Sequence, residues 1–149
     1  AARAVVYALR TRGWTVRITD LRQEQVDNLY THYSAQELDS SRLEVIPFTP
    51  QAIEAAGLDS DLVVNATPVG MHPNVDHCAW PEKIPVPARA CIYDVVYNPM
   101  ETKLLKLAAA AGLPCRNGLG MLVEQAALAF ECWTGFSPSR TRMLEAVRP

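Results

Sequence analysis

The sequence lacks a long apolar run, because none of its hydrophobic stretches approaches the roughly 20 residues that cross a bilayer. The amino terminus also lacks the charged segment and apolar core of a signal peptide. Neither sign of charge dominates, since 14 Lys and Arg stand against 16 Asp and Glu. No overall field therefore favours nucleic acid or an anionic membrane. We expect a cytoplasmic protein with neither of these partners.

Clustered metal ligands and paired cysteines are absent as well. No C-x-x-C pair occurs, and His77 beside Cys78 has no third ligand near it in sequence, so we expect no metal site. His72 and His77 lie in a proline-rich segment, where a solvated loop histidine is the default interpretation. We interpret the four cysteines as buried free thiols: Cys78, Cys91, Cys115 and Cys132.

The sequence does contain alternating strand and helix patterns, within 149 residues that are 49% hydrophobic and therefore long enough for one domain with a core. Apolar spacing predicts helices at 1–10, 22–33, 50–56, 102–111 and 118–133, with a last helix through 147. It predicts strands at 14–19, 43–47, 61–65, 90–94 and 113–116, that at 61–65 being buried. This alternation indicates an α/β fold whose mostly parallel sheet has helices on both faces.

Polar residues follow three of the predicted strands, namely Asp20, the segment 65–70 and the segment 94–97. Ligands of a doubly wound sheet bind beyond the carboxyl ends of its strands. We therefore expect these three segments to line one crevice.

The helix after Asn117 begins with two glycines and carries one amide, Gln125, at the spacing of an apolar face. The other members of that face are Met121, Leu122, Leu128, Ala129 and Trp133. We expect Gln125 to be buried with them. A desolvated amide is either hydrogen-bonded within the fold or directed at a polar ligand.

Three segments, 61–71, 93–105 and 117–135, resemble in order and interval the shikimate dehydrogenase family. They read DLVVNATPVGM, YDVVYNPMETKLL and NGLGMLVEQAALAFECWTG. The resemblance implies a Rossmann-like, doubly wound domain that binds NAD or NADP. It also implies hydride transfer between NAD(P)H and 3-dehydroshikimate or 3-dehydroquinate, in aromatic amino-acid biosynthesis through chorismate or in quinate metabolism.

The same resemblance implies an incomplete domain. Residues 1–4 are similar to those just after the family's Gly-Ala-Gly-Gly turn, so the first strand and the phosphate-binding turn are lacking from this sequence. We expect the NAD(P)-binding domain at 1–135 and a C-terminal helix at 136–149. The family's proton-transfer lysine and aspartate lie on a separate N-terminal substrate domain, and Lys83, Lys103 and Lys106 match neither. The segment alone should be inactive.

The resemblance also implies individual roles. Tyr97 and Gln125 are similar to the residues that contact the substrate, a cyclic polyhydroxy carboxylate whose hydroxyls neutral donors and acceptors can bind. Asp20 lies where a carboxylate can bind the adenosine ribose hydroxyls and repel a 2′-phosphate, which mildly favours NAD although Arg22 could reach a phosphate. The predicted cofactor contacts are Asp20, Arg22, Asn65, Ala66, Thr67, Val95, Gly118 and Met121.

Three alternatives stay open on the sequence alone. The scaffold could serve as a nucleotide-binding or regulatory module without chemistry, although the Tyr97 and Gln125 motifs argue against this. It could belong to a related nicotinamide enzyme of the folate or tRNA-reductase type, against which the same motifs argue. It could also be one part of a larger multifunctional polypeptide.

Overall fold

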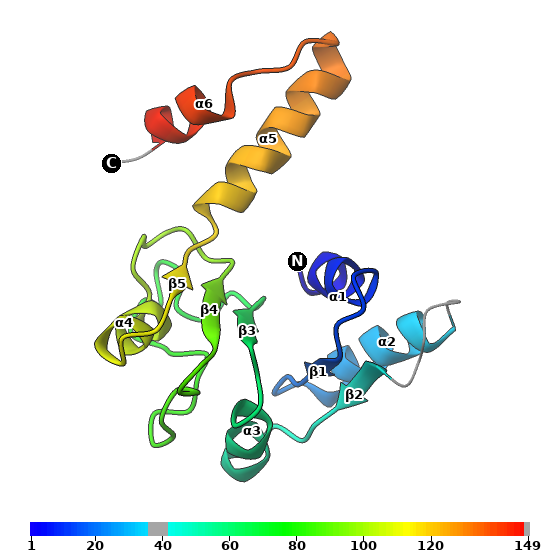
Figure 1. Cartoon of the computed structure of the whole chain (residues 1–149), viewed down its shortest axis with the longest axis vertical. Coiled ribbons are helices and arrows are strands. Elements are labelled where there is room, and N and C mark those ends of the chain that lie inside the picture. The colour runs from blue at the N-terminus through cyan, green and yellow to red at the C-terminus, as the bar shows by residue number, and fades with distance from the viewer. Residues whose placement is uncertain (36–41, 148–149) are drawn as a thin grey trace.

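A computed structural model describes residues 1–35 and 42–147, and within them all strand pairs are parallel (Figure 1). The helices are α1 (Ala2–Arg10), α2 (Gln23–Ser34), α3 (Pro50–Gly57), α4 (Lys103–Ala110), α5 (Leu119–Thr134) and α6 (Arg140–Val147). The strands are β1 (Val16–Ile18), β2 (Leu43–Val45), β3 (Leu62–Asn65), β4 (Cys91–Asp94) and β5 (Cys115–Arg116). The predicted α/β class and every predicted element in the described part are confirmed within a few residues.

The strands form two sheets and not the single sheet that we expected. One has the order β1-β2 and the other the order β3-β4-β5. The second edge of β1 and that of β3 pair with no strand among the described residues, and both strands line a cavity of about 940 Å³, which we call the sheet cavity. In a doubly wound sheet a further strand joins two such edges, so the sheet cavity lies between the two sheets at that place.

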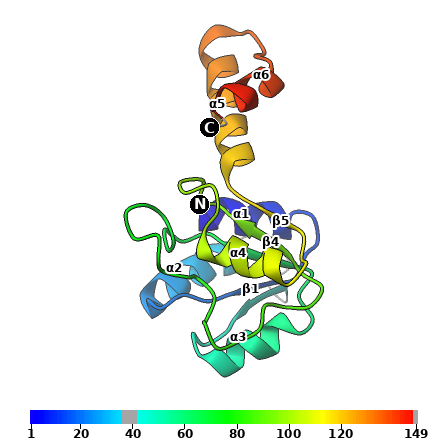
Figure 2. The same cartoon turned by 90° about the vertical axis from the view of Figure 1, so that its left-hand side faces the viewer.

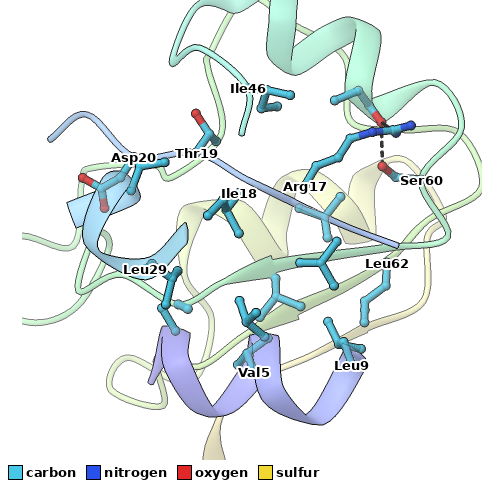
Figure 3. Close-up of a pocket in the computed structure, with 18 of the residues that line it drawn as sticks. Val5, Leu9, Arg17, Ile18, Thr19, Asp20, Leu29, Ile46, Ser60 and Leu62 are labelled. Carbon is cyan, nitrogen blue, oxygen red and sulfur yellow. Dashed lines mark hydrogen bonds between the residues drawn. The ribbon is translucent and has the colours of Figure 1, made fainter. Parts of the chain in front are cut away.

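Figure 3 shows what the sheet cavity contains. Val5 and Leu9 of α1 face Ile18 of β1 across it, and Leu62 lies at its edge. Because β3 has this open side, Leu62, Val63 and Val64 are only half-buried, and the expectation of a fully buried strand was wrong for them. Arg17 of β1 holds the segment between α3 and β3 at one end, where its guanidinium bonds to Asp59 at 2.5 and 3.0 Å.

Each sheet has its own apolar core. The three-stranded sheet packs against α4 and the proline-rich loop through Trp80, Ile84, Ala90, Ile92, Leu104, Leu105 and Ala108, together with Ile53 of α3. The two-stranded sheet packs against α1 and α2 through Val6, Val16, Ile18, Val26, Tyr33 and Leu43. The α2 and α4 helices thus cover different sheets (Figures 1 and 2).

Several helix ends follow from local sequence. The Thr49 hydroxyl caps α3 by accepting a hydrogen bond from the Ala52 N–H, and Pro50 starts that helix without an N–H to satisfy. The Thr102 hydroxyl caps α4 in the same way, accepting from Leu105 N–H at 3.3 Å. Gly135 ends α5 with a φ of 73°, the left-handed conformation that glycine adopts without strain.

The α5 helix projects from the body of the chain and returns only through α6 (Figures 1 and 2). Its buried face consists of Leu119, Val123 and Ala127. Gln125 is exposed, and Leu128 and Trp133 are 58% and 81% exposed, so the predicted buried face was wrong. The residues at 119, 123 and 127 share one face of the helix at four-residue spacing. Where α5 projects from the rest of the chain, few described residues pack against its other faces.

The predicted free thiols are confirmed, but none is fully buried: Cys132 is exposed and the other three are half-buried. Over the described ranges, no group of three potential metal-ligating side chains converges. In these ranges no helix combines the length and the apolarity that crossing a membrane requires.

Candidate functional site

A second cavity of about 340 Å³ lies where β3 and β4 end. We call it the turn pocket, because its walls are the turn 66–68 after β3 and the turn 95–98 after β4. Ala1, Ala66, Thr67 and Pro68 line both this pocket and the sheet cavity, so the two cavities meet at the turn after β3. Ala1 places the start of α1 at the same junction.

The turn after β3 is held by the side chain of Asn65, which is 5% exposed. Its Oδ1 accepts hydrogen bonds from the Thr67 N–H at 3.0 Å and from the Thr67 hydroxyl at 2.7 Å. Its Nδ2 donates to the Val69 carbonyl at 3.2 Å and to the Asp94 carboxylate at 2.9 Å. Since the Asn65 amide is occupied within the fold, the wall of the pocket is formed by Ala66, Thr67 and Pro68.

The turn after β4 begins at Asp94, the last residue of the strand. Its carboxyl group is fully buried and accepts from Asn65 Nδ2, from Val96 N–H at 3.0 Å and from the Thr102 hydroxyl at 2.6 Å. Burial raises the pKa of Asp94, and the hydrogen bonds from Thr102, Val96 and Asn65 oppose that rise. One carboxyl group therefore joins β3, the turn after β4 and the start of α4.

The start of α5 lies directly against this turn. Gly118 donates its N–H to the Val96 carbonyl at 3.1 Å, and a Cβ on Gly118 would lie 1.9 Å from the Val95 carbonyl oxygen. The two backbones can approach so closely only because residue 118 has no side chain. The predicted cofactor contacts Val95 and Gly118 are thus neighbours, although they are 23 residues apart in sequence.

Asp20 and Arg22 lie beyond the end of β1 and line the sheet cavity. The Asp20 carboxylate accepts from the Arg22 N–H at 2.8 Å and lies 3.5 Å from Arg22 Nε. Figure 3 places Asp20 at the opposite end of the cavity from Arg17. The three segments expected in one crevice therefore line two joined cavities, with Asp20 in the larger and residues 95–97 in the smaller.

The two predicted substrate residues lie on different elements. Tyr97 lines the turn pocket and is 43% exposed. Gln125 is exposed on α5, and Met121, one turn before it, is half-buried; neither lines either cavity. The structure thus groups Tyr97 with Val95 and Thr67 in one pocket, and it leaves Gln125 accessible on the projecting helix.

Asp94, Thr102 and His72 were not among the predicted contacts. Asp94 was expected only as part of the segment 94–97 that lines the crevice, and Thr102 only as the start of a helix. Their sequence signal was an acidic residue at a strand end eight positions before a helix-capping threonine. His72 also lines the turn pocket, with its N–H bonded to the Asn98 carbonyl at 3.0 Å.

The family model that matches this chain and two of its curated relatives carry the name shikimate dehydrogenase. Residues 118–148 match the family model "Shikimate 5'-dehydrogenase C-terminal domain". The shikimate dehydrogenase (NADP(+)) of Salinibacter ruber is 40% identical over 151 residues, which cover 99% of this chain and 52% of that protein. That of Methanocaldococcus jannaschii is 34% identical, covering 99% and 51%. The chain thus spans about half the length of the curated relatives it matches.

Solved structures agree with these relatives. Shikimate 5-dehydrogenase from Thermus thermophilus, in complex with NADP(H) and shikimate, has a TM-score of 0.78 at 31% identity, covering 96% of this chain and 49% of that one. Quinate dehydrogenase from Corynebacterium glutamicum, in complex with NAD, also has a TM-score of 0.78, at 34% identity and the same coverage.

Proposed function

Because the chain belongs to the shikimate dehydrogenase family as its C-terminal part, we propose that it is the cofactor-binding domain of a shikimate or quinate dehydrogenase. The complete enzyme would transfer hydride reversibly between NAD(P)H and 3-dehydroshikimate or 3-dehydroquinate. The observation that carries the proposal is the turn pocket between the turns after β3 and β4, the second of which contacts Gly118 at the start of α5.

The residues at the two cavities fit a dinucleotide. Asp20 would hold the adenosine ribose at the end of β1, and the free N–H groups at the start of α1 would face the pyrophosphate. The close approach of Gly118 to Val95 holds the start of α5 against the turn that carries Val95, and the Val95 wall of the turn pocket would face the flat nicotinamide ring. Ala66 and Thr67 would form the opposite wall. Met121 lines neither cavity, and we propose its contact with the ring only from the resemblance of its motif.

The bound nicotinamide would supply the hydride chemistry, and the residues of this chain would bind the cofactor and orient it toward the substrate. Tyr97, half exposed at the turn pocket, would contact the hydroxyls of the polyhydroxy carboxylate substrate. Gln125 would approach the same substrate from α5. The proton transfer would be performed by a lysine and an aspartate of the substrate domain, which lies outside these 149 residues.

The α5–α6 projection supports a partner of this kind. Trp133 is 81% exposed, Phe136 is 74% exposed and Leu128 is 58% exposed, all on or just after α5. Large exposed apolar side chains at one end of a molecule are typical of an interface. We propose that the substrate domain of the same enzyme covers them.

For the cofactor itself, we propose a mild preference for NAD over NADP. The Asp20 carboxylate, 22% exposed and lining the sheet cavity, would repel a 2′-phosphate. Arg22 opposes this preference because its side chain is 69% exposed and lies within 3.5 Å of Asp20. The curated relatives are named as NADP(+) enzymes, while the Corynebacterium glutamicum enzyme was solved with NAD.

A chimera tests the proposed function. The chain would be joined to the N-terminal half of the Salinibacter ruber relative, and shikimate- or quinate-dependent reduction of NAD and NADP would be followed by the absorbance of the reduced ring. We expect turnover by the chimera and none by residues 1–149 alone. A folded chimera that binds cofactor without turnover would instead indicate a non-catalytic nucleotide-binding module, and turnover by the chain alone would contradict the division of roles.

A further inference from the structure

The fully buried carboxyl group of Asp94 satisfies three uncharged donors on three different elements. The Asn65 amide approaches from the end of β3, the Val96 N–H from the turn after β4 and the Thr102 hydroxyl from the start of α4, at 2.9, 3.0 and 2.6 Å. Asp94 lines neither cavity. It can therefore influence a ligand only through the residues that it holds.

Its first effect is on the orientation of the Asn65 amide. A carboxylate only accepts hydrogen bonds, so Asn65 must turn its Nδ2 toward Asp94 and its Oδ1 toward Thr67. That oxygen then receives both the N–H and the hydroxyl of Thr67, at 3.0 and 2.7 Å. The polarity of Asp94 thus fixes the turn that forms one wall of the turn pocket.

Its second effect is on the opposite wall. The Oδ1 atom that accepts from Asn65 also accepts from the Val96 N–H, which holds the turn carrying Val95 and Tyr97. Its Oδ2 accepts the hydroxyl proton of Thr102, whose oxygen is engaged as the cap of α4 by Leu105 N–H. The buried carboxyl group of Asp94 therefore fixes the positions of both walls of the pocket relative to each other.

We propose that Asp94 is a positioning residue for the cofactor, setting the separation and orientation of the two turns before the ligand binds. This inference rests on the proposed function, since it assigns the nicotinamide to the turn pocket. Preorganised donors and walls need no rearrangement on binding, so loss of preorganisation lowers the affinity for the ligand.

The substitution Asp94→Asn tests the proposal, because an amide cannot accept at both of its ends. If its oxygen faces Asn65 and Val96, its NH2 faces Thr102 and the Thr102 hydroxyl loses this acceptor. If the substituted amide is turned the other way, its NH2 faces the Val96 N–H, and two donors then meet without an acceptor. In the complete enzyme we expect the Kd of NAD(P)H, measured by fluorescence of the reduced ring, to rise about tenfold, as for one lost charge-assisted hydrogen bond, with kcat changed less than KM for the cofactor.

Two kinds of control separate positioning from general destabilisation. Ile84→Ala removes a buried side chain that lines neither cavity, so it should lower Tm and leave the Kd of NAD(P)H unchanged. Thr102→Ser keeps the hydroxyl and should retain affinity, whereas Thr102→Val removes the donor and should weaken binding in the same direction as Asp94→Asn. The threonine pair also provides the test if Asp94→Asn does not fold.

The outcomes are distinct. Wild-type affinity in Asp94→Asn, or an equal loss of affinity in Ile84→Ala at a similar Tm, would overturn the positioning role while leaving the proposed function intact. Failure of the complete wild-type enzyme to bind either dinucleotide would overturn the proposed function, and the positioning role with it.

Discussion

Gly118 meets Val95 so closely that one added carbon would lie 1.9 Å from the Val95 carbonyl oxygen and 2.5 Å from its carbonyl carbon. Both obstacles are backbone atoms and cannot rotate away. Gly118→Ala should therefore destabilise the fold by at least about 3 kcal/mol, the upper end of ordinary overpacking costs. Chemical denaturation followed by circular dichroism measures this loss.

Gly120 is the matched control, because a Cβ built there meets no heavy atom within 4 Å beyond its chain neighbours and its own helix, and it lies in the first turn of α5, which Gly118 precedes. Gly120→Ala should raise the free energy of unfolding by about 0.5–1 kcal/mol, the propensity difference between the two residues in a helix. Equal effects of the two substitutions would contradict the close contact at Gly118.

The coenzyme preference should depend on Asp20. Removing its charge in Asp20→Asn takes away the repulsion of a 2′-phosphate, so kcat/KM for NADP relative to NAD should rise about tenfold, or about 1.4 kcal/mol. Steady-state kinetics of the complete enzyme with both cofactors gives the ratio. Asp27→Asn makes the same change in net charge on the exposed surface of α2 and should leave the ratio as it was. An unchanged ratio in Asp20→Asn would assign the preference to other residues.

Substrate binding should depend on the phenol of Tyr97. Tyr97→Phe keeps the ring at the turn pocket and removes only the hydroxyl, so KM for shikimate or quinate should rise about tenfold while KM for the cofactor stays constant. Gln125→Ala should act in the same direction. A change confined to the cofactor KM would show that Tyr97 serves the dinucleotide.

The fold was largely predictable because its elements have strong local signals, such as the Thr49-Pro50 start of α3 and the Gly135 end of α5. Which face of α5 is buried was not predictable. The spacing that includes Gln125 and Trp133 is apolar enough for a core, but the helix leaves the body, and a single sequence does not reveal which surfaces find a partner. The role of Asp94 was also hidden, since its three donors come from separate segments of the chain.

Acid stability should carry a signature of Asp94. Burial holds the pKa of Asp94 above its ordinary value of 3.8. Between the ordinary pKa and the raised pKa, the folded state therefore binds a proton more readily than the unfolded state. The contribution of this group to stability is therefore fully present below the ordinary pKa and is lost as pH rises through the raised one. The free energy of unfolding of the wild type minus that of Asp94→Asn, from denaturation at several pH values, should fall over this window and then level. A difference that rises over the window would mean that the hydrogen bonds outweigh burial.

The location of the nicotinamide tests the account most directly. A crystal structure of the complete enzyme, or of the chimera with the Salinibacter ruber substrate domain, should be determined with NAD(P)H bound. We predict the ring in the turn pocket, against the backbone of Val95 and Gly118, with Tyr97 facing the substrate side. A ring bound away from these two backbones would contradict the assignment of this site.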